Sequence, residues 1–411
     1  MSNPICVIGA GIVGVSTALW LQRQGQRVIL IDRDTPGQAA SYGNAGLIAQ
    51  WASVPVNTPG IWRDLPSMLF NPKSALFIRW KYLPKMIPWL TQFMMNATDT
   101  KARAVTKSLH GLLYDAVDQH KNLARGTPVE KWIADSKFSY IYKTRADYEA
   151  SSYSWNLKRE LGFEPQLFQG HEVQEQEPNL GQGIGFMAQL SGHGHILNPG
   201  EYVRNLALVF EQQGGTFIQT TVTDFTKSNG TVTAVLTEQG PIECSNVVVT
   251  SGIWSKSLMQ RLGLNIPLET ERGYHIMFKN ASGKPSHPLM AAGKFAITPM
   301  GDDLRCAGTV ELGGLDLPRS SAPLDIIRDF IKIALPNLEA QDTTEWMGFR
   351  PSTPDSMPLI GNITGTNIYT GFGHQHMGLT AGPKTGQILA QMMTNHPINA
   401  DYSAFDPNRY T

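Results

Sequence analysis

With 411 residues, the chain exceeds the size of one ordinary hydrophobic core, so we expect two closely packed domains. Its 34 Lys and Arg residues balance its 34 Asp and Glu residues without any basic run, which argues against a nucleic-acid-binding protein. Cys6, Cys244 and Cys306 are far apart and lack C-x-x-C spacing, which argues against a disulfide framework and fits a reducing compartment such as the cytoplasm.

The chain begins with a strand–turn–helix–strand pattern. Residues 5–8 are a short apolar run, and Gly9, Gly11 and Gly14 follow at G-x-G-x-x-G spacing before a helix that Gly25 would end. A second apolar run ends at Asp32, placed to accept hydrogen bonds from a ribose. The glycines allow a tight turn, close approach of phosphates and packing of the helix, whose N-terminus attracts negative charge. The pattern predicts a dinucleotide site but does not choose between NAD and FAD.

The next part of the chain is read as a loop followed by helices. Residues 35–60, rich in Gly, Ser and Asn, predict an extended loop, and residues 61–125 are mainly helical. Apolar spacing over residues 109–120 predicts one amphipathic helix. Residues 82–97 predict a helix that covers a pocket or, alternatively, touches a membrane or partner. A further helix is expected over residues 143–162, with Thr144 as N-cap and Gly162 as stop.

Strands dominate the second half. One helix is expected to start at Asn198-Pro199, and two others are expected over residues 323–334 and 379–394. The expected strands are 216–222, 231–237, 246–250, 274–278, 295–298, 304–307 and 367–370. The strand ends at 247–252 and 368–373 run into glycine, like the first strand. Ligands of open parallel sheets lie beyond such strand ends. Because the chain leaves this fold and returns to it, FAD is favoured over NAD.

Four motifs carry a resemblance that covers nearly the whole chain. They are Gly9-Ala-Gly-Ile-Val-Gly14, Ser41-Tyr-Gly-Asn-Ala-Gly46, Gly348-Phe-Arg-Pro-Ser-Thr-Pro-Asp355 and Gly371-Phe-Gly-His-Gln-His-Met-Gly-Leu-Thr380. The chain resembles the FAD-dependent D-amino acid oxidase/glycine oxidase superfamily, most of all the bacterial D-amino acid dehydrogenases. The resemblance implies an α/β (α+β) fold: a Rossmann-like FAD-binding domain (1–60, about 145–260 and 340–411) and an antiparallel-sheet substrate-binding or cap domain (about 61–144 and 261–339).

The resemblance also implies the residues that contact FAD. Asp32 and Arg33 would hold its adenosine end, and a helix N-terminus near Gly378 would face the flavin. The complete implied set is Gly9, Gly11, Ile12, Val13, Gly14, Asp32, Arg33, Ser41, Asn44, Ala45, Gly46, Leu47, Val222, Gly252, Gly373, Met377, Gly378, Leu379 and Thr380.

For the substrate, the resemblance assigns Arg350 to the carboxylate, a role that a planar bidentate donor suits. His374 and His376 depart from the expected terminal motif; either is expected to contact substrate or flavin, or simply to pack. Tyr274 is expected either to hydrogen-bond the substrate or to be a buried tyrosine. His193 and His195 are either pocket residues or part of a solvated turn, and without a third ligand at recognisable spacing no metal site is predicted.

The expected reaction is therefore FAD-dependent oxidation of a small amino acid at Cα, most like that of a D-amino acid dehydrogenase. D-proline or hydroxy-D-proline dehydrogenation and glycine or N-methyl amino acid oxidation stay open, as does a flavin-binding subunit of a multi-chain complex. The expected electron acceptor is a quinone or an electron-transfer partner. No apolar stretch is long enough to span a membrane, and the first strand begins at once, which leaves no room for a signal peptide. We therefore expect a cytoplasmic protein, with peripheral contact at the inner face of the membrane as an option.

Overall fold

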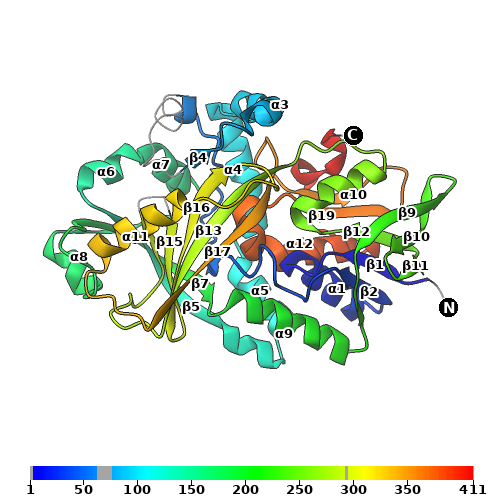
Figure 1. Cartoon of the computed structure of the whole chain (residues 1–411), viewed down its shortest axis with the longest axis horizontal. Helices are drawn as coiled ribbons and strands as arrows, with labels where there is room; N and C mark the ends of the chain where they lie inside the picture. Colours follow the sequence, from blue (N-terminus) through cyan, green and yellow to red (C-terminus); the bar gives the residue numbers. More distant parts are fainter. Residues whose placement is uncertain (1–2, 63–75, 292–294, 411) are drawn as a thin grey trace.

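The computed structural model describes residues 3–62, 76–291 and 295–410, which form two large sheets with helices around them (Figure 1). The elements before residue 200 are β1 (Ile5–Ile8), α1 (Ile12–Arg23), β2 (Val28–Asp32), β3 (Leu47–Ile48), β4 (Leu76–Ile78), α3 (Leu83–Met95), α4 (Asp99–Leu113), α5 (Ala116–Ala124), β5 (Ile133–Tyr142), α6 (Arg145–Ala150), α7 (Ser152–Glu160), β6 (Gln166–Gln169), α8 (His171–Gln176) and β7 (Phe186–Ile196). The elements that follow are α9 (Pro199–Gln212), β8 (Thr216–Gln219), β9 (Val222–Ser228), β10 (Thr231–Thr237), β11 (Gly240–Glu243), β12 (Asn246–Val249), α10 (Ser255–Arg261), β13 (Glu269–Lys279), β14 (Leu289–Ala291), β15 (Phe295–Met300), β16 (Asp303–Leu312), α11 (Ala322–Ala334), β17 (Asp342–Ser352), β18 (Leu359–Asn362), β19 (Ile368–Phe372) and α12 (Gly378–Met393).

The first sheet has the strand order β18-β19-β12-β1-β2-β8, and its strands are parallel except for β18. Successive residues of β1 point to opposite faces. Ile5 and Val7 share a core with helices α1, α9 and α12, whereas Cys6 and Ile8 share one with the small β9–β11 sheet. Both faces are therefore covered, as a parallel sheet requires, and the strand ends at Ile8, Asp32 and Val249 meet at one edge.

The second sheet has the path β17-β13-β16-β15-β14-β5-β7-β3, with β4 paired to β16 and β6 to β7. Helix α11 covers one face, where Tyr274 and Ile276 of β13 pack with Ile327 and Ile331. In Figure 1 this sheet stands to the left of the first sheet, and β17 and β13 lie nearest the junction. The opposite face of the sheet is thus turned toward the strand ends of the first sheet.

Three predicted elements differ in the structure. The expected strand 216–222 is split, because β8 ends at Gln219 in the first sheet and β9 begins at Val222 in the small sheet. The expected helix 109–120 breaks between α4 and α5 at Asp115, whose carboxylate accepts hydrogen bonds from Gln119 and Lys384. The expected helix 143–162 is broken at Ser151 into α6 and α7, although Thr144 caps α6 as predicted. In each case the apolar periodicity continues across a local break.

Strand pairing divides the chain differently from the expected domain limits at several places, one of them β3 of the expected segment 1–60, which pairs with β7 in the second sheet. Strand β17, expected in the FAD-binding domain, pairs with β13 in the second sheet, and β6 and β7 also belong to that sheet. The expected returns of the chain to the first sheet at β8, β12 and β19 agree with its strand order. The pairing partners of β17 are set by long-range contacts that local sequence patterns do not reveal.

Candidate active site

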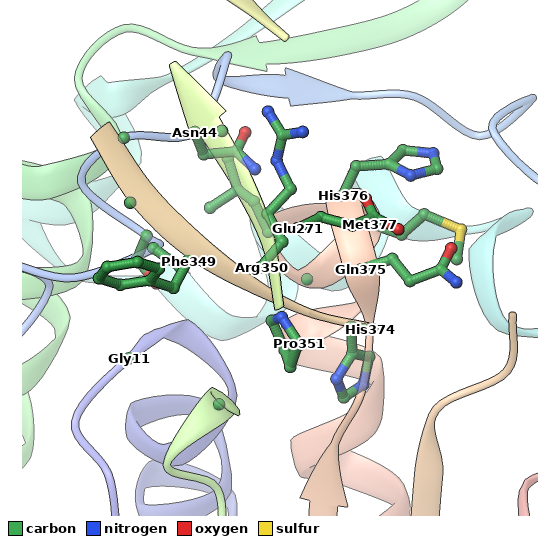
Figure 2. A pocket seen from close by; sticks show the side chains of 18 of the residues that line it. Gly11, Asn44, Glu271, Phe349, Arg350, Pro351, His374, Gln375, His376 and Met377 are labelled. Atoms are coloured by element: carbon green, nitrogen blue, oxygen red, sulfur yellow. The ribbon is translucent and has the colours of Figure 1, made fainter. Parts of the chain in front are cut away.

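A continuous cavity of about 1190 Å³ joins the strand ends of the first sheet to the open face of the second sheet (Figure 2). Its wall includes Gly9 and Asp32 at one end and Arg350 and Trp89 at the other. Ordinary small-molecule pockets occupy about 300–1,000 Å³. The cavity therefore has room for an extended cofactor together with a small substrate.

The glycine-rich turn at the first end is shaped for close backbone approach. A Cβ on Gly14 would lie 1.8 Å from the Gly9 carbonyl oxygen, so a side chain there would push α1 off the turn. Gly9 has φ +110, and Gly11 at the N-cap of α1 offers no side-chain cap. The hydroxyl of Ser41 accepts a hydrogen bond from the amide of Ile12 at 3.0 Å and ties the following loop to this turn. The turn and the helix N-terminus fit a pyrophosphate.

Asp32 lies at the end of β2, beside the turn. Its carboxylate accepts hydrogen bonds from the amides of Ala10 (2.6 Å) and Asp34 (3.0 Å). Burial raises its pKa, and these two donors oppose that shift. Arg33 places its guanidinium 4.0 Å from the centre of the Trp254 ring, and both residues line the cavity. With Val222 and Gly252 in the same wall, this end fits an adenosine.

The middle of the cavity is formed by the loop before β3 and by the start of α12. Asn44, Ala45 and Leu47 line it from the loop, and Met377, Gly378, Leu379 and Thr380 line it from the helix. The Thr380 hydroxyl donates to the Leu47 carbonyl at 3.0 Å, which joins the two segments. No side chain caps the N-terminus of α12 among the described residues, so its positive dipole end is available to an anionic ring edge.

Arg350 extends from β17 into the far end of the cavity. Its guanidinium lies across Gly273, where a Cβ would come within 2.6 Å of the Arg350 Cζ atom. Burial lowers the pKa of Arg350 and nearby Glu271 raises it, and an arginine stays charged under either influence. Within the described ranges, no residue forms a hydrogen bond or ion pair with this guanidinium. The arginine is thus free to bind an anion from the cavity.

His374 and His376 both line the cavity. Burial lowers the pKa of His374 to about 3, and its Nε2 lies 2.9 Å from the Thr385 hydroxyl oxygen. The pKa of His376 falls to about 4, first through burial and then through the charge of Arg350. Both rings are therefore neutral at physiological pH and leave Arg350 as the cation of this region.

Tyr274, by contrast, does not line the cavity, which favours the buried tyrosine over a contact with substrate. Glu271 and Gly273 of β13 face the cavity. Successive side chains of a strand point to opposite faces, so Arg272 and Tyr274 point to the other face of the sheet. The Tyr274 hydroxyl donates to Glu311 Oε1 at 3.1 Å and accepts from the Ser320 amide at 3.2 Å, beneath α11. Tyr274 is the satisfied buried tyrosine that the sequence left as its alternative.

The other predicted residues divide into lining and supporting positions. Gly14, Gly46 and Gly373 do not line the cavity; Gly46 (φ +79) and Gly373 (φ +87) shape the backbone beside it. The remaining predicted cofactor residues all line it. His193 and His195 are buried on β7 rather than solvated, and neither faces this cavity. Across the described ranges, no group of three His, Cys, Asp or Glu side chains is placed to hold a metal ion.

Glu271, Trp346 and Lys158 are among the polar or aromatic residues of the cavity that sequence reasoning missed. Trp346 stacks on His275 with ring centroids 5.2 Å apart and lies over Gly348 and Gly43, where a Cβ would meet the indole within 2 Å. The glycine in the Gly348-Phe-Arg350 motif gave an indirect signal of such a close approach. Nothing in the local sequence distinguished Glu271 or Lys158.

Lys158 is buried in an aromatic box at the cavity wall. Its ammonium donates to the Tyr140 hydroxyl at 3.0 Å and lies 4.4 to 5.0 Å from the ring centres of Tyr140, Trp155 and Trp51. Among the described side chains, no carboxylate pairs with it. Burial lowers the pKa of Lys158 to about 7.

The Lys158→Met variant is expected to remove a pH dependence of stability. Between pH 7 and about 10.4 the unfolded chain binds a proton at this lysine that the folded protein has lost, so stability rises with pH. In this pH window we expect the unfolding free energy of the wild type to rise, relative to that of Lys158→Met, by up to about 1.4 kcal/mol per pH unit. Denaturant unfolding curves of both proteins at pH 7 and pH 9.5 measure this change. If the unfolding free energies of the two proteins differ by the same amount at both pH values, the prediction is contradicted.

Together the glycine turn, the acidic strand end, the helix N-terminus and the long cavity define an FAD-dependent oxidoreductase, and comparison with known proteins agrees. The sequence profile of the DAO family, described as FAD dependent oxidoreductase, matches residues 4–392, and the chain belongs to this family. A D-amino-acid oxidase of Bradyrhizobium diazoefficiens is 34% identical over 99% of this chain and 98% of its own length. A D-amino acid dehydrogenase of Granulibacter bethesdensis is 26% identical over 99% of both chains.

Solved structures show the same fold. Glycine oxidase from Geobacillus kaustophilus superposes with a TM-score of 0.74 at 20% identity, over 100% of this chain and 99% of its own. L-proline dehydrogenase from P. horikoshii superposes with a TM-score of 0.74 at 19% identity, over 100% and 98%. The Rossmann-like domain, the family and the FAD cofactor predicted from the sequence are thus confirmed.

Proposed function

We propose that this enzyme oxidatively deaminates a small α-amino acid, of D configuration, in the manner of a D-amino acid dehydrogenase. The observation that carries the proposal is Arg350, a cation without a protein partner among the described residues, placed in the cavity beyond the start of α12. A planar guanidinium binds a carboxylate through two parallel hydrogen bonds. The names of the two sequence relatives, D-amino-acid oxidase and D-amino acid dehydrogenase, support the same substrate class.

When FAD is bound, it supplies the hydride acceptor for the substrate Cα–H bond. The residues of this chain bind the substrate, stabilise the charge that develops and limit access of water. Arg350 fixes the carboxylate, and the N-terminus of α12 stabilises the negative charge that develops nearby. Helix α3 covers the cavity with Trp89, Phe93 and Met94 and so limits access of water. The imino product then hydrolyses in water to a keto acid, or remains cyclic if the substrate resembles proline.

Turnover with an artificial electron acceptor and a panel of amino acids tests the proposal. We expect keto acid formation from small D-amino acids and much less from their L enantiomers. Selective turnover of D-proline, hydroxy-D-proline, glycine or N-methyl amino acids would move the substrate to those alternatives. Absence of turnover with every amino acid would contradict the proposal and favour a flavin-binding subunit that needs partner chains.

We further propose that the enzyme passes electrons to a quinone or electron-transfer partner at the membrane surface, which it contacts peripherally. Helix α3, at the top of Figure 1, exposes Ile87 and Met95 to solvent by about half or more (52% and 64%). Trp62 and Trp80 beside it are each 55% exposed. Between Asp64 and Asp99 the sequence has cations but no acidic residue. Apolar and aromatic side chains with nearby lysines suit an anionic membrane surface. Among the described residues no helix could cross a bilayer.

Replacing Ile87 and Met95 together by serine is expected to reduce binding to vesicles that contain anionic lipid. Each replacement removes exposed apolar area, so the partition coefficient should fall about tenfold or more. Vesicle flotation measures the effect, and turnover with an artificial acceptor should be unchanged. Equal binding of the variant and the wild type to the vesicles would contradict the membrane proposal without touching the amino acid proposal.

A further inference from the structure

Next to Arg350, a second charged side chain faces the same part of the cavity. Glu271 of β13 is the direct cross-strand partner of Arg350 of β17. Directly opposed residues of an antiparallel pair share one face of the sheet and lie about 4.5–5.5 Å apart. Figure 2 shows the two side chains beside each other in the cavity, and both belong to its wall. The cavity thus presents one positive and one negative group at neighbouring positions.

The Glu271 carboxylate is only partly satisfied by the protein. Its Oε1 accepts a hydrogen bond from the Ser352 hydroxyl at 2.7 Å, and the residue is 6% exposed. Among the residues that the structure describes, none donates to its Oε2, and Arg350 does not form a direct ion pair with it. A buried carboxylate with so few donors is costly unless a cation or donor completes its environment. The open side of this carboxylate is the cavity.

We infer that Glu271 binds the amino group of the substrate while Arg350 binds its carboxylate. An α-amino acid carries a cationic nitrogen and an anionic carboxylate on adjacent carbons, which matches opposite charges on adjacent strands. The inference rests on the proposed amino acid substrate and deepens it, because it explains how the site would reject a carboxylic acid without an amine. Glu271 would repel such an acid, whereas it attracts the ammonium of an amino acid.

A pair of unreactive ligands isolates this role. 2-Aminoisobutyrate lacks a hydrogen on Cα and cannot be oxidised, and pivalate has the same shape with a methyl group in place of the amine. Their dissociation constants for the FAD-loaded enzyme can be measured by calorimetry and by the change in the flavin absorption spectrum. We expect Glu271→Gln to weaken binding of 2-aminoisobutyrate about tenfold or more and to leave binding of pivalate unchanged or tighter.

Two further variants test whether the effect of Glu271→Gln depends on the charge and on the position of this carboxylate. Glu271→Asp keeps the charge and should retain the preference for the amine-bearing ligand, even if Glu271→Gln folds poorly. Glu269→Gln changes a carboxylate two residues away that Tyr82 hydrogen-bonds and that does not line the cavity; it should affect neither ligand.

Two results with Glu271→Gln would overturn the inference about the amino group, and a third result, with the wild type, would overturn the proposed function. Equal weakening of both ligands by Glu271→Gln would mean that Glu271 only orients Arg350, and would overturn the inference. No change for 2-aminoisobutyrate would overturn it as well. If the wild type binds neither ligand and turns over no amino acid, the proposed function fails first and the inference fails with it.

Discussion

Arg350→Met is expected to raise the KM for the amino acid substrate about a hundredfold or more while FAD stays bound. Removing one member of a buried charged hydrogen-bonded pair costs about 2–5 kcal/mol, and a tenfold change corresponds to about 1.4 kcal/mol. Methionine keeps most of the apolar volume over Gly273, so the local packing survives. Steady-state kinetics over a wide range of substrate concentration measure the change.

The matched control for this prediction is Arg328→Met. Arg328 lies on α11, its side chain is 41% exposed, and it pairs with Asp325 and with the partly exposed Glu345 of β17. Exposed ion pairs contribute little, so this variant should keep the wild-type KM. An unchanged KM in Arg350→Met would remove Arg350 from the carboxylate site.

Gly14→Ala is expected to yield a protein that no longer retains FAD on purification. The new Cβ would meet the Gly9 carbonyl oxygen at 1.8 Å and the Thr250 hydroxyl at 2.6 Å. Backbone atoms cannot yield by that amount, so α1 must move away from the turn that receives the pyrophosphate. The ratio of flavin to protein absorbance in the purified protein measures the loss, which should exceed tenfold.

Gly111→Ala supplies the control, because Gly111 lies inside helix α4 and its added Cβ would meet nothing within 4 Å. Alanine is favoured over glycine in a helix interior by about 1 kcal/mol, so this variant should bind FAD normally and melt slightly later. Normal flavin content in Gly14→Ala would contradict the account of the glycine turn.

The cofactor half of the site was predictable because its determinants are local in sequence. The glycines, the end of β2 at Asp32 and the start of α12 each follow from a short pattern of strand, turn and helix. Residue types at fixed offsets determine such turns, and the structure places nearly all of the predicted residues in the cavity wall.

The substrate half was predictable only through the resemblance at Arg350. Whether Tyr274 or its neighbours face the cavity depends on the register between β13, β16 and β17, and a shift of one residue reverses every side chain. The bulge between Gly273 and His275 in the pairing with β16 adds a local irregularity that apolar periodicity cannot reveal. Glu271 was missed for the same reason, since its partner Arg350 is distant in sequence.

The central claim is that this cavity brings an amino acid anchored by Arg350 to the FAD cofactor. Anaerobic mixing of the purified FAD-loaded enzyme with the D and L enantiomers of a small amino acid tests it most directly. The D enantiomer is expected to bleach the visible absorption of the oxidised flavin, and the flavin of Arg350→Met is expected to be bleached only at a much higher concentration of the amino acid. Retention of the oxidised flavin spectrum with every amino acid tried would contradict the central claim.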